Sequence, residues 1–327
     1  MLLSVITVNW NSTGFLLQCL DALYTRTKGI DFEVVVVDNA SPDNGSGMIR
    51  EQFPGVHIIE SPTNIGFAAA NNLGFDHATG KYLLFLNPDT LVLGNAVATA
   101  VGHLERLGDA GAMGCKLLNS DMTIQTSAIL RFPTIINQLF TVEFLKQRFP
   151  LLGFWGIYPL FTDRGRPEEV EAISGAAMFV KREAFITAGK FDTRYFMYSE
   201  DVDLCHSIRK KGYKVYYTGD ASIVHHGGKS TVQSKVKAFT VLMMKESACE
   251  MLKKWRGPRY AGIYKAAFSI MSAIRLLLLA CAFPFAFAMG KAASISRSLA
   301  KWSTILKWSM GLSPVSALTG KYGYHAT

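Results

Sequence analysis

The sequence predicts an α/β fold in which a mostly parallel central sheet is flanked by helices, with a helical extension at the C-terminus. Two observations lead to this prediction. Short apolar, β-branched segments alternate with segments of helical period from residue 2 to residue 86, which is the pattern of a doubly wound parallel sheet. Residues 229–327 lack this alternation and are instead apolar and basic. With 327 residues, of which 49% are hydrophobic, the chain can bury a full core, which excludes wholesale disorder.

The predicted strands are continuous apolar runs, and loop-forming Asn, Asp, Ser or Pro residues follow several of them directly. The predicted helices have apolar residues three and four positions apart. In chain order the expected elements are strand Leu2–Val8, helix 14–25, strand Phe32–Val37, helix Met48–Phe53, strand His57–Glu60, helix Gly66–His77 and strand Tyr82–Leu86.

The pattern is less regular after residue 110. Residues 120–170 are expected to be rich in loops. A capping-box pattern at Ser230–Gln233 indicates the start of a helix that ends near residue 255, before Gly257-Pro258. The other expected elements are strands Gly111–Leu118, Ala176–Val180 and Lys214–Thr218, and helices 183–189 and 200–211.

Charge divides the chain into two parts. Residues 1–228 carry 19 basic and 23 acidic side chains, whereas residues 229–327 carry 15 basic and 2 acidic ones. We therefore expect an α/β domain over 1–230 and a helical, membrane-associating region over 231–327. Basic and apolar residues combined with Trp favour a membrane surface, and not nucleic acid, as the partner of that region.

The apolar stretch Leu276–Met289 has 14 uncharged residues, and extending it back to Ala266 places Arg275 near its middle. A spanning helix needs about 20 apolar residues. Trp302 and Trp308 follow, with Lys and Arg at helical intervals, as in helices that lie in the membrane interface. We favour monotopic attachment; a true span or hairpin and a protein or homo-oligomer interface stay open.

Five scattered cysteines without a Cys-x-x-Cys pair argue against a disulfide scaffold or a Cys-based zinc site and fit a reducing compartment. The apolar run at residues 2–8 is too short for a secretory signal and has no basic segment before it. We therefore expect the α/β domain at the cytoplasmic face of the inner or plasma membrane, attached peripherally or monotopically.

Polar side chains follow three of the predicted strands, namely Asn9, Asn11, Asp38, Asn39 and Asp89. Because ligands bind beyond the carboxyl ends of such strands, these side chains should converge on one crevice. A carboxylate at Asp38 can accept the imide N–H of a pyrimidine base, although a turn cap would also explain it.

Asn87-Pro88-Asp89 ends a buried strand, where a carboxylate can hold Mg²⁺ or Mn²⁺ together with a diphosphate; an ordinary Asx-Pro turn is the alternative. His225 follows another strand and could be a second ligand. We rank it above His226, which precedes a Gly pair. Gly66 and the small residues after it begin a predicted helix. Small residues at this position let a phosphate approach the helix N-terminus, or they let the helix pack closely on the sheet.

Three carboxylates lie within four positions at Glu200-Asp201-Val202-Asp203, beside Phe196 and Tyr198. Acidic residues suit any helix start, but apolar and like-charged neighbours also raise the pKa of a carboxyl group, as a general base requires. Asp201 is the candidate base. P-loop, complete dinucleotide-binding, zinc-protease and serine-hydrolase motifs are missing from the sequence.

Six segments in this order resemble the family 2 inverting glycosyltransferases of GT-A fold, and most closely their rhamnosyltransferase group. They cover about residues 2–230: Ser4–Asn11, Val37–Ser41, Asn64–Asn72, Asn87–Asp89, Ser174–Met178 and Glu200–Asp203. Asn87 replaces the first Asp of the Asp-x-Asp metal motif of this family. The resemblance implies a site for each part of the reaction. The donor nucleotide would bind at Thr7, Asn9, Asn11, Asp38, Asn39 and Gly66, and the donor sugar at Asn71, Asn72 and Asn87. The acceptor would bind at Ser174, Gly175, Ala176 and Glu200, a divalent metal at Asp89 and His225, and Asp201 would be the base.

The implied reaction is a single displacement in which Asp201 deprotonates the acceptor hydroxyl as it attacks the anomeric carbon. The resemblance implies dTDP-L-rhamnose as the donor, with a UDP-hexose as the alternative. Membrane attachment would suit a polyprenyl-diphosphate-linked acceptor, and a polysaccharide acceptor is also open. A sugar nucleotidyltransferase and a non-catalytic membrane scaffold are competing hypotheses, but the first lacks its Gly-rich basic loop and the second does not explain the cluster of carboxylates.

Overall fold

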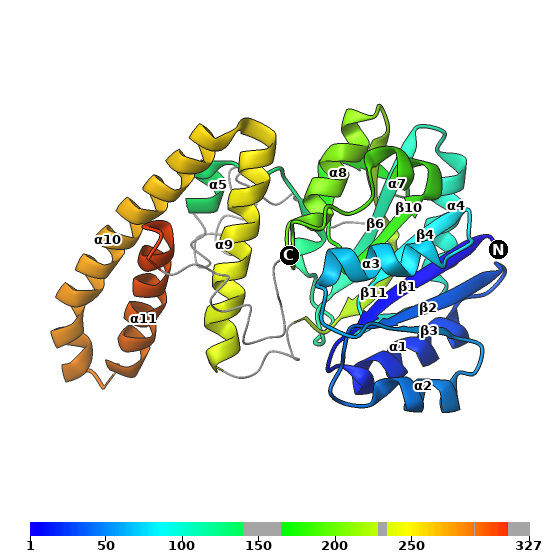
Figure 1. Cartoon of the computed structure of the whole chain (residues 1–327), viewed down its shortest axis with the longest axis horizontal. Helices are drawn as coiled ribbons and strands as arrows, with labels where there is room; N and C mark the ends of the chain where they lie inside the picture. Colours follow the sequence, from blue (N-terminus) through cyan, green and yellow to red (C-terminus); the bar gives the residue numbers. More distant parts are fainter. Residues whose placement is uncertain (140–164, 228–233, 291, 313–327) are drawn as a thin grey trace. The chain divides into compact units, whose positions relative to one another are not determined.

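The computed structural model describes residues 1–139, 165–227, 234–290 and 292–312 (Figure 1). The chain forms two compact units. The sheet unit comprises Met1–Phe132 and Phe144–Ser230, and the helical unit comprises Pro133–Glu143 and Thr231–Thr327. The helical unit thus includes a segment from the middle of the chain as well as its C-terminal part.

The sheet unit is built on a nine-stranded sheet with the order β3-β2-β1-β4-β10-β6-β11-β5, and β8 pairs with β11. A separate two-stranded sheet joins β7 and β9. The strands are β1 Leu3–Asn9, β2 Phe32–Asp38, β3 His57–Glu60, β4 Tyr82–Leu86, β5 Thr90–Val92, β6 Ala110–Leu118, β7 Ile129–Leu130, β8 Glu168–Val170, β9 Ala172–Ile173, β10 Ala177–Lys181 and β11 Lys214–His225.

The pairing of the first four strands is parallel and places their carboxyl ends together. Asn9 at the end of β1 lies opposite Asp38 at the end of β2, and β4 pairs with β1 on the other side. β10 departs from the parallel direction, because it runs antiparallel to both β4 and β6. The predicted mostly parallel sheet is confirmed, and β10 brings the segment before it next to the end of β4.

Helices cover the sheet as the sequence pattern requires (Figure 1). α3 packs on β1 and β2, α4 packs on β6, β10 and β11, and α8 packs on β6, β9 and β11. The helices of this unit are α1 Thr13–Arg26, α2 Gly45–Gln52, α3 Phe67–Asp76, α4 Ala96–Arg106, η1 Thr126–Ala128, α7 Arg182–Ala188 and α8 Glu200–Lys210.

Several features of the sheet unit are absent from the sequence prediction, among them β7, β8 and β9, as well as α4, β5 and the later part of β11. α4 buries Val97, Val101 and Leu104 at helical spacing, so its pattern was available in the sequence. β5 has three residues, which is too short for periodicity to reveal. β11 continues beyond the predicted end at Thr218 as far as His225, with a register irregularity between Thr218 and Ser222.

The helical unit contains α5 Ile135–Leu139, α9 Ser234–Arg256, α10 Pro258–Ala288 and α11 Ala292–Ser309. α10 packs on the other three. Gly257, at φ 87°, separates α9 from α10, and Pro258 begins α10 at a position where its missing N–H costs nothing. The capping box predicted at Ser230–Gln233 lies outside the described residues.

One tryptophan differs from its predicted place at a membrane interface. Trp308 is buried, its indole N–H donates to the Glu246 carboxylate, and its ring packs against Tyr264 and Phe268. It is a core residue of the helical unit, because α10 and α9 supply its apolar and acidic neighbours. Trp302 lies beneath the guanidinium of Arg275, 4.3 Å from its carbon to the ring centre.

α10 is the one helix among the described residues that is long and apolar enough to cross a membrane, by length and composition, over Pro258–Phe285. Only 11% of its most apolar window is buried. Its exposed large side chains are Ile263, Ile270, Ile274, Leu277, Leu278, Phe285 and Phe287. The helix thus has an apolar face that the rest of the described chain does not cover.

Candidate active site

The ends of β1 and β2 place Asn9 beside Asp38. Asn9 donates through its Nδ2 to Thr13 Oγ1 at 3.0 Å and to Asp38 Oδ2 at 3.4 Å, while its Oδ1 accepts from Ser12. Asp38 Oδ1 accepts the backbone N–H of Ser41 at 2.7 Å. Asn9 is fully buried and Asp38 nearly so. Asn9 therefore orients the carboxylate of Asp38, and the nucleotide-base role of both residues stays a prediction.

The start of α3 was predicted to receive phosphate. The backbone N–H groups of Ile65, Gly66 and Phe67 donate to Asn39, Asn64 and the carbonyl of Phe196, respectively. Gly66 has φ 83°, and a Cβ there would lie 2.6 Å from the Phe196 carbonyl oxygen. These three groups are occupied by the protein, and the close contact at Gly66 is with Phe196 in the segment before α8 and not with the sheet, so the phosphate role and the sheet-packing role of Gly66 both stay predictions.

The two predicted nucleotide-binding residues Thr7 and Asn11 differ in burial. Thr7 is buried in β1, and its hydroxyl has no hydrogen-bond partner among the described residues. Asn11 is exposed at φ 52°, and its backbone N–H donates to Ser41 Oγ at 2.6 Å. The loop after β1 is therefore tied to the loop after β2, and the side chain of Asn11 lies at the surface.

The predicted donor-sugar residues Asn71 and Asn72 both bind the protein backbone. Asn71 Nδ2 donates to the carbonyl of Phe67 at 2.9 Å. Asn72 donates to the carbonyl of Phe191 at 2.8 Å and accepts its N–H at 3.1 Å. Asn72 thus holds α3 against the segment that leads to α8, and neither donor-sugar role is tested by this geometry.

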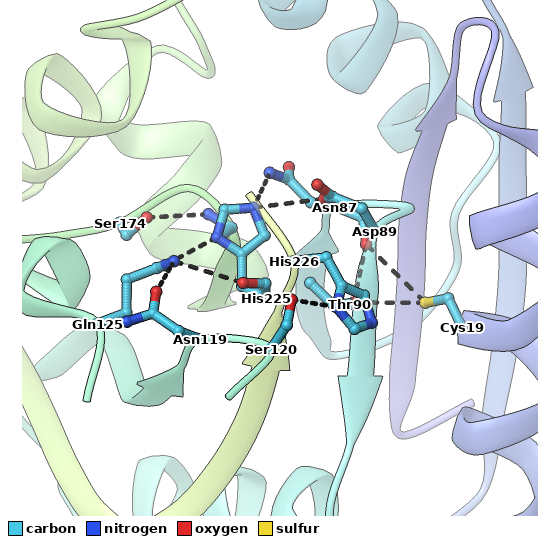
Figure 2. Close-up of polar contacts among 11 residues, drawn as sticks. Cys19, Asn87, Asp89, Thr90, Asn119, Ser120, Gln125, Ser174, His225 and His226 are labelled. Carbon is cyan, nitrogen blue, oxygen red and sulfur yellow. Dashed lines mark hydrogen bonds and ion pairs between the residues drawn. The ribbon is translucent and has the colours of Figure 1, made fainter. Parts of the chain in front are cut away.

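The structure brings the predicted metal residues together at the ends of β4 and β11 (Figure 2). His225 Nε2 lies 3.3 Å from Asp89 Oδ1 and 3.3 Å from Asn87 Nδ2. The His225 and Asp89 side chains are 16% and 12% exposed, so a small ligand can reach them. His226 points to another neighbour, with its Nδ1 2.8 Å from Ser120 Oγ.

Asp89 and His225 form a chemically suitable but incomplete ligand set. Carboxylate oxygen and imidazole nitrogen both suit Mn²⁺, and neighbouring ligands of an octahedral ion lie ~3 Å apart, close to the observed separation. No group of three or more His, Cys, Asp or Glu side chains that could hold a metal occurs in the described part of the chain. The two residues therefore fit a cation that takes its remaining ligands from elsewhere, such as the phosphates of a nucleotide.

Residues Ser174–Ala176 connect this pair to the predicted base. The carbonyl of Ala176 accepts the backbone N–H of Asn87 at 2.9 Å, and the N–H of Gly175 donates to Asp201 Oδ2 at 2.8 Å. A Cβ on Gly175 would lie only 3.2 Å from the Cβ of Asp201. The antiparallel direction of β10 thus joins the metal residues and the base through one short segment.

Asp201 and Glu200 are adjacent carboxyl groups in different states. Burial raises the pKa of both, and the charge of Asp201 raises that of Glu200 further, well above its ordinary value. Asp201 also accepts N–H groups from Gly175 and Val202, each at 2.8 Å, whereas Glu200 Oε2 accepts none among the described residues. The two N–H donors favour the ionised form of Asp201, whereas burial without a donor favours the neutral form of Glu200.

Backbone strain marks the same place. Tyr198 and Ser199 have φ values of 70° and 72°, and α8 begins at the next residue. Two consecutive non-glycine residues in the left-handed region cost about 1–3 kcal/mol each. Such strain persists where the surrounding structure enforces it, often at functional sites. No sequence pattern predicts this strain, because neither residue is a Gly or Asn.

Sequence reasoning also missed three polar residues of the loop after β6. Gln125 Oε1 lies 2.8 Å from His225 Nδ1, Asn119 lies behind Gln125, and Ser120 contacts His226 (Figure 2). They fall in or beside the stretch expected to be loop-rich. Gln125 lies 100 residues before His225, and no local pattern links the two.

Comparison with known proteins decides the family. The family model described as Glycosyl transferase family 2 matches residues 4–187, which is more than half of the chain. The chain belongs to this family. The predicted family and enzyme class are thereby confirmed: the protein is a glycosyltransferase.

Two relatives of this glycosyltransferase are rhamnosyltransferases by name. The N-acetylglucosaminyl-diphospho-decaprenol L-rhamnosyltransferase of Mycobacterium tuberculosis is 28% identical over 247 residues, covering 70% of this chain and 77% of its own. Rhamnosyltransferase WbbL of Escherichia coli is 25% identical over 212 residues, covering 60% of this chain and 75% of its own.

Solved structures confirm the GT-A fold. The mannosyltransferase of Pyrobaculum calidifontis, solved with GDP-Man and Mn²⁺, has a TM-score of 0.54 at 20% identity and covers 99% of this chain and 88% of its own. TarS of S. aureus (residues 1–349) has a TM-score of 0.51 at 13% identity, covering 95% and 92%. The predicted divalent metal is supported in one respect, since structural neighbours are solved with Mn²⁺.

Proposed function

We propose that this glycosyltransferase moves L-rhamnose from dTDP-L-rhamnose onto a polyprenyl-diphosphate-linked sugar or a growing envelope polysaccharide, with inversion at the anomeric carbon. The observation that carries the proposal is the setting of Asp201, a partly buried carboxylate whose two oxygens accept the N–H groups of Gly175 and Val202, beside the buried Glu200. The catalytic domain is the sheet unit, and residues 231–327 attach it to the membrane.

Asp201 is suited to remove a proton from an alcohol. Burial raises its pKa, which strengthens it as a base, and the N–H groups of Gly175 and Val202 fix both of its oxygens. An acceptor hydroxyl that approaches Asp201 loses its proton to the carboxylate as its oxygen bonds to the anomeric carbon. The bond from that carbon to the nucleoside diphosphate breaks on the opposite face, which inverts the configuration.

The donor would lie along the carboxyl ends of β1, β2 and β4. Asp38 would accept a hydrogen bond from the base, while Asp89 and His225 would hold a divalent cation. That cation, when bound, neutralises charge on the departing diphosphate. Asn87 would border the sugar because it lies between His225 and Ala176, and Ser174, Gly175 and Glu200 would border the acceptor next to Asp201.

The choice of substrates draws on the relatives. The mycobacterial relative is named for a rhamnose donor group and a decaprenol-linked acceptor, and the bacterial relative WbbL is also a rhamnosyltransferase. A lipid-linked acceptor agrees with the uncovered apolar face of α10. We place the reaction at the cytoplasmic face of the membrane, where nucleotide sugars are made.

The test is a transfer assay with purified full-length protein. dTDP-L-rhamnose, UDP-glucose, UDP-galactose and GDP-mannose are each offered with a polyprenyl-diphosphate-N-acetylglucosamine acceptor and Mn²⁺ or Mg²⁺, and lipid-linked products are identified by mass spectrometry. A rhamnosylated lipid formed from dTDP-L-rhamnose alone supports the proposal. Transfer from a UDP-sugar instead keeps the fold and the base but replaces the donor.

A further inference from the structure

The loop after β6 holds His225 from the side opposite to Asp89. His225 Nδ1 lies 2.8 Å from Gln125 Oε1, while its Nε2 faces Asp89 and Asn87 (Figure 2). A neutral imidazole carries one proton, and the nitrogen that lacks it is the one able to bind a cation. The orientation of the Gln125 amide therefore decides which nitrogen is available.

The Gln125 amide can take only one orientation. Its Nε2 lies 3.1 Å from Asn119 Oδ1 and 3.4 Å from the backbone carbonyl of His225, and both of these are acceptors. A flipped amide would direct its oxygen at two oxygens, at the cost of a lost hydrogen bond on each side. The oxygen of Gln125 must therefore face His225, where it accepts Nδ1–H.

The Asn119 amide is fixed in turn by a carboxylate at the end of a chain of hydrogen bonds. Asp121 has only acceptor oxygens, so Thr123 donates its hydroxyl proton to Asp121 Oδ1 at 2.6 Å. Thr123 Oγ1 must then accept from Asn119 Nδ2 at 2.9 Å. This leaves Asn119 Oδ1 toward Gln125. Every donor direction along the path follows from the charge on Asp121.

We propose that Gln125 is a positioning residue that fixes His225 as its Nδ1–H tautomer, with the Nε2 lone pair directed toward Asp89. Asn119, Thr123 and Asp121 support the orientation of Gln125. With Nδ1 protonated, Nε2 and Asp89 Oδ1 are two acceptors 3.3 Å apart, an arrangement that a cation stabilises. The inference rests on the cation role proposed for His225, since its purpose is to keep a ligand nitrogen free.

Removal of the Gln125 acceptor has a directional consequence. In Gln125→Leu the Nδ1 proton loses its partner, while Asp89 Oδ1 stays beside Nε2, so the proton should move to Nε2. Gln125→Glu keeps an acceptor oxygen beside Nδ1 but loses the two hydrogen bonds that Gln125 Nε2 donates to Asn119 and to the carbonyl of His225, so it disturbs the loop and should still retain the Nδ1–H tautomer. The pair therefore separates loss of the acceptor from disturbance of the loop.

The first experiment is ¹⁵N NMR of full-length protein labelled at histidine, at a pH of ~8.5, where an ordinary imidazole is neutral. A His225→Asn variant assigns the signal. We expect Nδ1–H in the wild type and in Gln125→Glu, and Nε2–H in Gln125→Leu. An Nε2–H tautomer in the wild type overturns the proposal even where a variant fails to fold, and so does an unchanged Nδ1–H tautomer in folded Gln125→Leu.

The second measurement is Mn²⁺ affinity by electron paramagnetic resonance, with no sugar donor present. Loss of a partner behind a ligating histidine weakens metal binding about 10–100-fold, so Gln125→Leu should show that loss and Gln125→Glu should not. Equal Mn²⁺ affinity in wild type and Gln125→Leu overturns the proposal. Because neither readout uses a donor or acceptor, failure of rhamnose transfer would appear only in the transfer assay and would leave these results standing.

Discussion

The two units of this glycosyltransferase use apolar residues in different ways. In the sheet unit, β1, β2 and β4 bury nearly every residue, and the polar groups of the site lie where those strands end. In the helical unit, α10 is the most apolar helix but leaves Leu277, Leu278 and Phe285 exposed. Apolar residues thus form the buried interior of the sheet unit, whereas on α10 they form an exposed apolar surface, which is unfavourable in water.

The interior of the helical unit is small and aromatic. Trp308, Tyr264 and Phe268 pack together, and Glu246 accepts the indole N–H of Trp308. This arrangement accounts for the Trp308 side chain without a membrane. The contrast with the exposed leucines of α10 shows that neighbouring apolar segments of similar composition can form a buried core and an exposed surface.

The largest expected effect tests the catalytic role that we propose for the sheet unit. Asp201→Asn removes the base and should lower kcat by about 10²–10⁴-fold, with dTDP binding retained. In wild type, kcat/KM should fall as the pH decreases through the raised pKa of the Asp201 carboxyl, because only the ionised form accepts a proton. Asp21→Asn, at an exposed carboxylate of α1, is the control. Turnover of Asp201→Asn near that of wild type would remove Asp201 from the role.

Trp308→Ala tests whether this residue belongs to a core. Large-to-small changes of buried aromatic residues cost about 3–5 kcal/mol, so hydrogen exchange of α10 and α11 should accelerate strongly. Trp302→Ala, at a half-buried position, is the matched comparison and should cost less. If Trp308→Ala weakened vesicle binding with no change in exchange, the residue would lie at the membrane interface.

Leu277→Glu combined with Leu278→Glu tests the uncovered face of α10. The two side chains are 66% and 63% exposed, so the fold should tolerate the change. The charged side chains would lose the free energy that two leucines gain on transfer from water into a membrane. Binding to anionic vesicles, measured by sedimentation, should therefore fall by more than about tenfold. Gln18→Glu with Gln52→Glu adds the same charge at exposed positions of the sheet unit. Equal binding by both double variants would place the attachment elsewhere.

The smallest expected effect concerns Glu200, the more deeply buried member of the carboxyl pair. Burial raises the pKa of Glu200 in the folded state, so the folded protein binds a proton there that the unfolded chain releases near pH ~4.3. The free energy of unfolding therefore falls as pH rises from the ordinary pKa to the raised one, by at most about 1.4 kcal/mol per pH unit. Glu200→Gln should flatten that decline in urea titrations. An unchanged slope would mean that Glu200 is ionised in the folded protein.

The sequence by itself determined the fold class, the family and the order of the site residues along the chain. These are local properties, because a buried strand reads as an apolar run and the polar residue after it is adjacent in sequence. Asn9, Asp38 and Asp89 could be grouped for that reason. Their grouping needs only the rule that the ends of parallel strands meet at one edge.

Tertiary structure decided everything that depends on partners distant in sequence. The antiparallel β10 joins Asn87 to the segment that holds Asp201, Gln125 reaches a histidine 100 residues away, and Phe196 occupies the space beside Gly66. The burial of Trp308 and the exposure of Leu277 likewise follow from which helices pack on α10. Periodicity along a chain indicates how a single helix or strand is formed. These contacts depend instead on how several elements pack against one another, and local sequence does not encode that packing.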